Sequence, residues 1–177
     1  HLGRTLRSYV KEIQLLMRDI VREQEEKRKS ELDALQSQIN PHFLYNTLDS
    51  VVWMIEGKRH EDAVLMITRL ASLFRISLSG GKTVISMEAE LQHAENYMNI
   101  QKVRFKNSFR MRYEIDPAVR NYCTVKLILQ PILENAIYYG VKGMEDEGEI
   151  LLRAELADGE LVLTVRDNGY GIPAEEV

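Results

Sequence analysis

Three short segments of the sequence carry side chains that can take part in chemistry: His42, Asn135 and Asp167. A neutral imidazole is a competent nucleophile near pH 7. An Asn amide oxygen is a hard ligand suited to Mg²⁺, an ion that proteins often share with nucleotide phosphates. A carboxylate that follows a buried strand can accept a hydrogen bond from an exocyclic amine. Each of the three also has a purely structural interpretation.

The first segment, Gln38-Ile39-Asn40-Pro41-His42-Phe43-Leu44-Tyr45-Asn46, places a proline inside an otherwise helical pattern. Proline in a helix interior removes a backbone hydrogen bond at a cost of about 3 kcal/mol, so the pattern predicts a kink. A kink beside an imidazole favours exposure of the ring. The alternative is a structural histidine, which is the interpretation that we give to His60 and His93.

The second segment runs from Gln130 to Gly140 and is strongly apolar at helical spacing. Glu134 and Asn135 are its polar members, and Asn135 is a candidate Mg²⁺ ligand. Tyr138 and Tyr139 offer aromatic faces to a purine. Alternatively, Glu134 and Asn135 only form hydrogen bonds within the fold.

The third segment follows an expected strand and reads Asp167-Asn168-Gly169-Tyr170-Gly171. Glycines without a Cβ let the backbone approach a ligand closely. An Asp-Asn-Gly sequence is also an ordinary turn, so this motif alone leaves both interpretations open.

The element that precedes the first segment is a long helix. Apolar residues recur at alternating spacings of four and three, which is typical of a coiled-coil seam: Leu2, Leu6, Tyr9, Ile13, Leu16 and Ile20. The seam fades over residues 22–31 and returns at Leu32, Leu35 and Ile39. The eleven-residue step from Val21 to Leu32 indicates a change of supercoil phase. The polar stretch is either a solvated part of the helix or a mechanically soft joint.

Residues from about 34 to 79 read as two amphipathic helices separated at Gly57. The second helix is expected to carry one apolar face: Ala63, Ile67, Leu70, Phe74 and Leu78. Two such helices cannot bury both stripes alone, whereas two copies can do so as a four-helix bundle. The pattern therefore predicts a homodimer.

The remaining residues have an α/β pattern. Ser86 is expected to cap a helix, residues 109–115 alternate as in a strand, and a helix is expected over about 125–139. Two strands, 149–157 and 160–166, follow and are joined at Asp158-Gly159, a strong two-residue turn signal.

Composition excludes several other classes of function. The 177 residues are 45% hydrophobic and 28% charged with a net charge of −4, which predicts a folded protein without an electrostatic surface for nucleic acid. One cysteine, Cys123, excludes an internal disulfide and a thiolate zinc site. We expect no membrane span, since no run approaches the roughly 20 apolar residues required.

Taken together in their order and spacing, these segments resemble the sensor histidine kinases whose phospho-acceptor motif reads Q-I-N-P-H-F-L-Y-N-T-L, the YesM/LytS-like family. The likeness covers almost the whole chain. Besides the segment around His42, it rests on four further motifs: Glu25-Glu26-Lys27-Arg28, Tyr97-Met98-x-Ile100-Gln101-x-x-Arg104-Phe105, Leu129-Gln130-Pro131 with Glu134-Asn135-Ala136, and Asp167-Asn168-Gly169-x-Gly171-Ile172.

The resemblance implies a role for each candidate residue. His42 matches the acceptor of the γ-phosphoryl group of ATP, and Asn135 matches the residue that holds Mg²⁺ against the phosphates. Asp167 matches the carboxylate that recognises the adenine amine, with Gly169 and Gly171 lining the base pocket. Phosphate is then expected to pass to an aspartate of a response regulator.

The chain departs from the family pattern at two positions and from orthodox histidine kinases at a third. Tyr139 stands where the family usually has His, a change that should preserve nucleotide binding, and Lys126 replaces a proline. Phe43 follows His42 where orthodox histidine kinases have an acidic residue. The general base is therefore unassigned, and Glu134 is the candidate that we name.

The expected fold class is α+β, in three parts. Residues 1–33 form a signalling coiled coil after a HAMP-like module, 34–82 the dimerisation and phosphotransfer domain, and 83–177 a partial Bergerat-type (GHKL) ATP-binding sandwich. We expect the nucleotide lid and second glycine-rich box to follow Val177, which leaves the isolated chain inactive. This would be the cytoplasmic portion of a membrane protein. The alternative function is a dimerising relay module that performs no chemistry.

Overall fold

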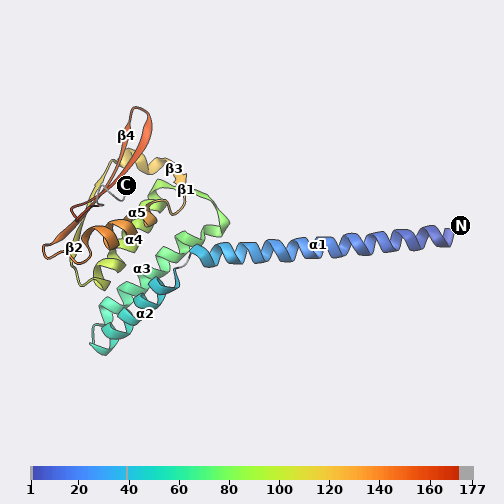
Figure 1. The fold of residues 1–177 in the computed structure, drawn as a ribbon, viewed down its shortest axis with the longest axis horizontal. Helices are drawn as coiled ribbons and strands as arrows, with labels where there is room; N and C mark the ends of the chain where they lie inside the picture. The colour runs from blue at the N-terminus through green and yellow to red at the C-terminus, as the bar shows by residue number, and fades with distance from the viewer. Residues whose placement is uncertain (1, 39, 172–177) are drawn as a thin grey trace. The chain divides into compact units, whose positions relative to one another are not determined.

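A computed structural model describes residues 2–38 and 40–171 of the chain (Figure 1). The chain divides into two compact units, residues 1–43 and 44–177. Both helices and strands are present, in agreement with the expected α+β class.

The first unit consists mainly of one helix, α1 (Leu2–Gln38). Among its described side chains, residues 9–28 are all exposed. Four members of the expected seam, Tyr9, Ile13, Leu16 and Ile20, are each more than half exposed. Leaving an apolar stripe of this kind in water costs free energy, which favours its burial in a coiled coil. The coiled coil itself stays a prediction. The side chains of Leu2, Leu6, Leu32, Leu35 and Ile39 lie outside the described set.

Pro41 begins helix α2 (Pro41–Glu56) and does not kink a continuous helix, so the expected kink is wrong. The Asn40 side-chain oxygen accepts hydrogen bonds from the backbone N–H groups of His42 (3.1 Å) and Phe43 (3.3 Å). Asn40 is thus the N-cap and Pro41 occupies the first helical position, where a missing N–H costs nothing. The proline specifies where α2 starts.

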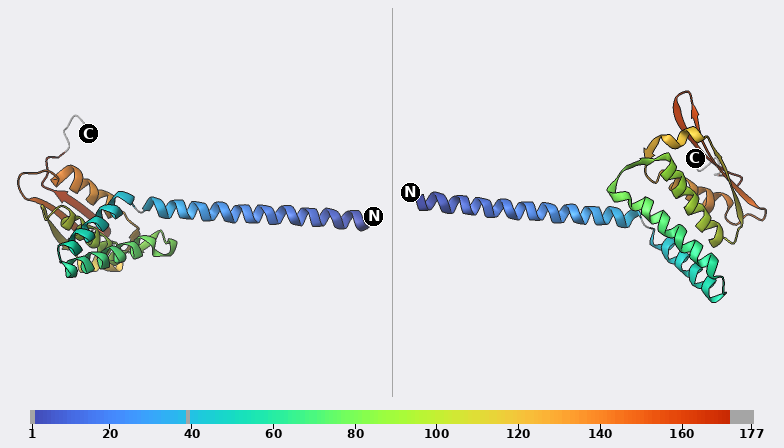
Figure 2. Two further views of the ribbon diagram at one scale, coloured as in Figure 1. Left: turned by 90° about the horizontal axis from the view of Figure 1, so that it is seen from below. Right: turned by 180° about the vertical axis from the view of Figure 1, so that it is seen from behind.

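Helices α2 and α3 (His60–Leu78) form an antiparallel hairpin over residues 44–78 (Figure 2). The break expected at Gly57 is present, but Lys58 is the residue with positive φ (58°). The expected apolar face of α3 is split in two. Ala63 and Leu70 are buried, whereas Ile67 and Leu78 belong to an exposed stripe that begins at Val64.

The core-facing side of α3 packs against helix α4 (Met87–Arg104). Ser77 of α3 and His93 of α4 are both buried, and the Ser77 hydroxyl lies 2.9 Å from His93 Nε2. Asn96 also donates to the Ser72 hydroxyl across this contact (3.2 Å). Between the two helices come a short 3₁₀ turn, η1 (Ser79–Gly81), and strand β1 (Val84–Ser86).

Ser86 caps α4 as the sequence predicts, because its hydroxyl accepts from the Ala89 backbone N–H (3.1 Å). The face of α4 toward the core is buried over most of its length. A 3₁₀ segment, η2 (Pro117–Asn121), follows the next strand.

Three strands form the main sheet in the order β2 (Phe109–Ile115), β4 (Gly148–Ala157), β5 (Glu160–Asp167). Strands β2 and β4 are parallel, and β4 and β5 form an antiparallel hairpin. Asp158 and Gly159 both have positive φ, as a type I′ turn requires. The expected strand over 109–115 and the expected hairpin are therefore confirmed.

The expected helix over 125–139 is wrong at its start. Val125 ends strand β3 (Cys123–Val125), which pairs with β1. Helix α5 covers only Leu129–Asn135, and a π-helix, η3 (Ala136–Val141), continues it. The apolar residues before Leu129 are thus shared between a strand and a turn.

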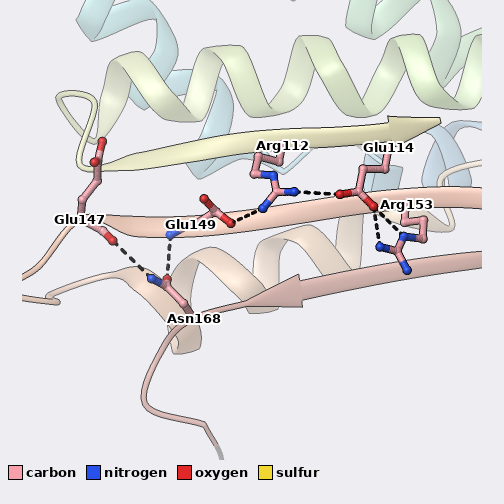
Figure 3. A network of polar contacts seen from close by, with 6 residues as sticks. All are labelled: Arg112, Glu114, Glu147, Glu149, Arg153 and Asn168. Carbon is pink, nitrogen blue, oxygen red and sulfur yellow. Dashed lines mark hydrogen bonds and ion pairs between the residues drawn. The ribbon is translucent and has the colours of Figure 1, made fainter.

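The sheet has one buried and one solvated face. Ile150, Leu152 and Ala154 of β4 are buried toward the helices, whereas the intervening side chains face water. On the solvated face Arg112 pairs with Glu114 and Glu149, and Arg153 also pairs with Glu114 (Figure 3). Hydrogen bonds from Arg153 lower the pKa of the Glu114 carboxyl.

No helix within residues 2–38 or 40–171 is long and apolar enough to cross a bilayer.

Candidate functional site

Helix α4 holds α5 and η3 through three side chains at seven-residue intervals, Glu90, Tyr97 and Arg104. Residues seven apart lie on nearly the same face of an α-helix. The three therefore form a stripe that reaches successive parts of the neighbouring helix.

Glu90 caps α5 from outside. Its two carboxylate oxygens accept the backbone N–H groups of Leu127 and Leu129, each at 2.9 Å, and its side chain is fully buried. Ile128, the residue before α5, provides no side-chain cap. A carboxylate at a helix N-terminus satisfies free N–H groups and complements the helix dipole. Glu90 thus determines where α5 starts.

Tyr97 reaches the candidate site through Glu134. Its hydroxyl donates to Glu134 Oε1 at 3.0 Å and accepts from Gln101 Nε2 at 2.6 Å. Gln130 donates to the same Glu134 oxygen at 3.1 Å. Burial, followed by the charge of Glu134, raises the pKa of Tyr97 well above its usual range, so the hydroxyl remains a donor at any physiological pH. Glu134 is therefore oriented by two donors.

Arg104 completes the stripe. One guanidinium nitrogen donates to the Tyr138 hydroxyl at 2.9 Å and to Gln101 Oε1 at 3.2 Å. The Phe105 ring meets the Tyr138 ring edge-on, with centroids 5.8 Å apart. Tyr138 is consequently held at both its hydroxyl and its ring.

The backbone that follows Asn135 forms a π-helix rather than an α-helix. Segments of this type are rare and are frequent at functional sites. The η3 segment carries Tyr138, Tyr139 and Gly140, and it ends where the Lys142 backbone N–H donates to the Ile137 carbonyl at 2.9 Å.

A cavity of about 370 Å³ opens on this segment and is lined by Glu134, Asn135, Tyr138, Tyr139 and Lys142. It is thus lined by four residues that were predicted from sequence to act on nucleotide: Glu134, Asn135, Tyr138 and Tyr139. Asn135 and Tyr139 are exposed, and Tyr139 is 77% exposed. Both side chains are accessible to a ligand.

Gly140 and Gly169 provide a close approach beside Asp167. A Cβ on Gly140 would lie 2.6 Å from the Asp167 carboxyl carbon, and a Cβ on Gly169 would lie 2.2 Å from the Gly140 carbonyl oxygen. At Gly169 the clash is with backbone, so no side chain fits there, whereas a side chain at Gly140 fits only if the Asp167 carboxyl moves. The backbone of η3 and the turn after β5 are therefore in contact. This contact lies next to the cavity, because Tyr139, which precedes Gly140 in the chain, lines the cavity.

Asn168 pins the Asp167 turn to the sheet. Its side-chain oxygen accepts from the Glu149 backbone N–H (2.7 Å), and its amide nitrogen donates to the Glu147 carbonyl (3.3 Å; Figure 3). The Asp167 carboxylate also accepts from the Gly169 backbone N–H at 2.9 Å. Gly171 has a φ of +72°, which favours glycine.

His42 lies in the other unit, on the first turn of α2, and its side chain is exposed. The expected exposure of the ring is therefore confirmed. His93, in contrast, is buried at the α3–α4 contact, and burial lowers its pKa to about 4. Across residues 2–38 and 40–171, no three His, Cys, Asp or Glu side chains cluster as metal ligands do.

Several residues of the site were not predicted from sequence. Gly140, Glu90 and Arg104 make contacts that link positions far apart in the chain. The seven-residue spacing of Glu90, Tyr97 and Arg104 was the available signal. This spacing predicts contacts only when the helix that packs against α4 is known.

Comparison with known protein families matches two regions of the chain. A family model described as "Histidine kinase" matches residues 30–109. A model described as "Histidine kinase-, DNA gyrase B-, and HSP90-like ATPase" matches residues 124–177, which assigns part of an ATP-binding domain to them.

Full-length relatives agree with these matches. The chain is 36% identical over 171 residues to the sensor histidine kinase YesM of Bacillus subtilis, covering 97% of this chain and 30% of the relative. It is 33% identical over 151 residues to the sensor protein LytS of Staphylococcus saprophyticus, covering 85% and 25%. It is 31% identical over 160 residues to the sensor histidine kinase BtsS of Escherichia coli, covering 88% and 28%.

The chain belongs to the sensor histidine kinase family. It spans less than a third of the length of these sensor histidine kinases. The segment from Asn40 to Phe43 lies within the first family match, and Asn135 and Asp167 lie within the second.

Proposed function

We propose that the protein is an ATP-dependent protein-histidine kinase that phosphorylates itself on His42 and then passes the phosphoryl group to an aspartate of a response regulator. The observation that carries this proposal is the combination of an exposed histidine at the start of α2 with an accessible Asn135 and a glycine-lined Asp167 in a chain of this family.

In the first step, a lone pair on an imidazole nitrogen of His42 forms the N–P bond to the γ-phosphorus. The bond from that phosphorus to the β–γ bridging oxygen breaks, and ADP leaves with the electron pair. The proton on the ring is then released, with Glu134 as the base that we assign. In the second step the N–P bond breaks as a receiver aspartate oxygen bonds to phosphorus, and the ring takes up a proton, which restores the neutral imidazole.

The residues of η3 and of the Asp167 turn fit a nucleotide. Asp167 would accept from the adenine amine, with Gly169 and Gly171 lining the base pocket and Tyr139 contributing an aromatic face. The absence of a Cβ at Gly140 and Gly169 lets η3 and the turn after β5 pack directly against each other beside Asp167. Asn135 would hold Mg²⁺, which neutralises charge on the phosphates.

We further propose that two copies of the chain associate through the exposed apolar stripes of α2 and α3. These stripes consist of Tyr45, Leu48, Val52 and Ile55 on α2 and of Val64, Ile67 and Leu78 on α3. Burying them in a four-helix bundle removes apolar area from water, at about 25 cal/mol per Å². The domain boundaries near residues 33 and 82, and the cytoplasmic placement of this region, stay predictions.

The alternative is a dimerising relay module that performs no chemistry. The exposed stripes favour dimerisation whether or not phosphate is transferred, so they support both functions equally. Only the phosphoryl-transfer step separates the two.

The test uses the full-length natural protein with γ-labelled ATP and Mg²⁺. We expect a label that is lost in acid, that is absent from His42→Gln, and that is also absent from Asn135→Ala. His60→Gln is the matched control, since His60 is also exposed, and it should keep the label. Acid-stable label, or label that persists in His42→Gln, would refute the proposal. Absence of label in a folded dimer that binds ATP would favour the relay module.

A further inference from the structure

Lys142 is the cationic side chain in the lining of the η3 cavity, and neither the family motifs nor the expected site residues include it. Its ammonium nitrogen lies 5.2 Å from the centroid of the Tyr138 ring. A cation over the face of an aromatic ring at this distance is attracted by the ring quadrupole. The exposed Lys142 ammonium is therefore drawn toward the Tyr138 ring, in a lining that it shares with Asn135 and Tyr139.

The Tyr138 ring and the Lys142 backbone are both held in place by further contacts. Tyr138 is fixed by the hydrogen bond from Arg104 and by the edge of the Phe105 ring. The Lys142 backbone is fixed at the end of η3 by its bond to Ile137. A lysine loses about 2 kcal/mol of rotamer freedom when it is immobilised, so one that is already placed loses less when it meets a ligand.

The positive charge of Lys142 suits this cavity to a polyphosphate. The chain carries a net charge of −4, which opposes the approach of a polyphosphate. The nearest acid in the cavity lining, Glu134, already accepts hydrogen bonds from Tyr97 and Gln130. The Lys142 ammonium thus supplies positive charge to a cavity that also contains the candidate Mg²⁺ ligand.

The geometry points to Lys142 as a phosphate-binding residue that contacts the polyphosphate of the nucleotide, positioned by the ring of Tyr138. This inference rests on the proposed function, because it places a nucleotide in the η3 cavity. It assigns the recognition of phosphate charge to a residue outside the Asn135 and Asp167 motifs.

The test compares ligands that differ in phosphate number. Affinities of MgATP, MgADP and adenosine are measured by calorimetry on the full-length natural protein and on Lys142→Met, which removes the charge and keeps the aliphatic stem. A charge-assisted hydrogen bond predicts roughly tenfold weaker ATP binding in the variant, weaker ADP binding, and unchanged adenosine binding. Lys142→Arg should retain most of the affinity for ATP. Lys82→Met is the matched control, since Lys82 is exposed and lies outside the cavity lining.

Two results would overturn the inference. ATP binding by Lys142→Met that equals wild type would do so, and so would an equal loss for ATP and adenosine, which indicates altered cavity shape. If Asn135→Ala weakens MgATP binding while Lys142→Met does not, the inference fails and the proposed function stands. If the folded wild-type protein binds none of the three ligands, both fail.

Discussion

The start of α2 and the α5–η3 segment each present a candidate chemical group, but they are built differently. His42 is an exposed side chain on a first helical turn, and Asn40 caps the backbone beneath it. The α5–η3 segment is held from α4 at Glu90, Tyr97 and Arg104. Under the proposed function, His42 must meet ATP and then a receiver aspartate, which requires access, whereas the nucleotide site requires fixed geometry. The difference indicates that residues 44–177 supply the fixed geometry, through the contacts of α4 with the α5–η3 segment.

The largest effect that we expect concerns acid and the buried His93. Burial lowers its pKa from 6.5 to about 4, so the folded state keeps the ring neutral while the unfolded state binds a proton. Its contribution to stability is complete above pH 6.5 and is lost as the pH falls toward 4, by about 3 kcal/mol.

Urea unfolding of the protein between pH 7 and pH 4 measures this loss. His60→Gln should follow wild type, because His60 is exposed, and His93→Gln should show a smaller pH dependence whatever its stability at pH 7. Equal pH dependence in His93→Gln and wild type would show that the acid sensitivity of residues 44–177 does not come from this buried ring.

The next effect concerns the close approach at the Asp167 turn. Gly169→Ala forces a Cβ against the Gly140 backbone, so we expect the free energy of unfolding to fall by about 2 kcal/mol. We also expect the variant to bind nucleotide more weakly. Gly140→Ala meets side-chain atoms of Asp167, which can move, and should lose affinity with less loss of stability. Thermal unfolding and ADP titration measure the two quantities.

Gly143→Ala is the control for these glycines, because its Cβ meets open space and only its positive φ opposes the change. Strain of that kind costs about 1 kcal/mol and should leave ADP affinity intact. If Gly169→Ala behaved like Gly143→Ala, the contact between η3 and the Asp167 turn would be irrelevant to binding.

The smallest effect concerns the α4 stripe. Tyr97→Phe removes the hydroxyl between Glu134 and Gln101, and we expect a loss of about 1 kcal/mol of stability with a modest loss of nucleotide affinity. Tyr122→Phe, at an exposed tyrosine, should change neither. Wild-type affinity in Tyr97→Phe would mean that the fixed geometry of Glu134 plays no part in binding.

Local sequence signals predicted much of this architecture. The Ser86 cap, the Asp158-Gly159 turn and the alternation of residues 109–115 depend on neighbours in the chain, and the structure contains all three. The exposure of His42 was also predicted, although its cause is a helix start at Pro41 and not a kink.

The features that the sequence did not predict arise from contacts between distant residues. Val125 is apolar at helical spacing, but its pairing with Val84 makes it part of a strand. The start of α5 depends on Glu90, which lies 39 residues before Leu129. Likewise, the role of Gly140 is defined by Asp167 and Gly169, so tertiary contacts override the local pattern at these positions.

The most direct test of the account is to locate the phosphoryl group after the full-length natural protein has reacted with MgATP. Mass spectrometry at neutral or alkaline pH, where phosphohistidine survives, identifies the modified residue. We predict a single phosphoryl group on His42. A phosphoryl group on His60, on His93 or on a carboxylate would contradict it.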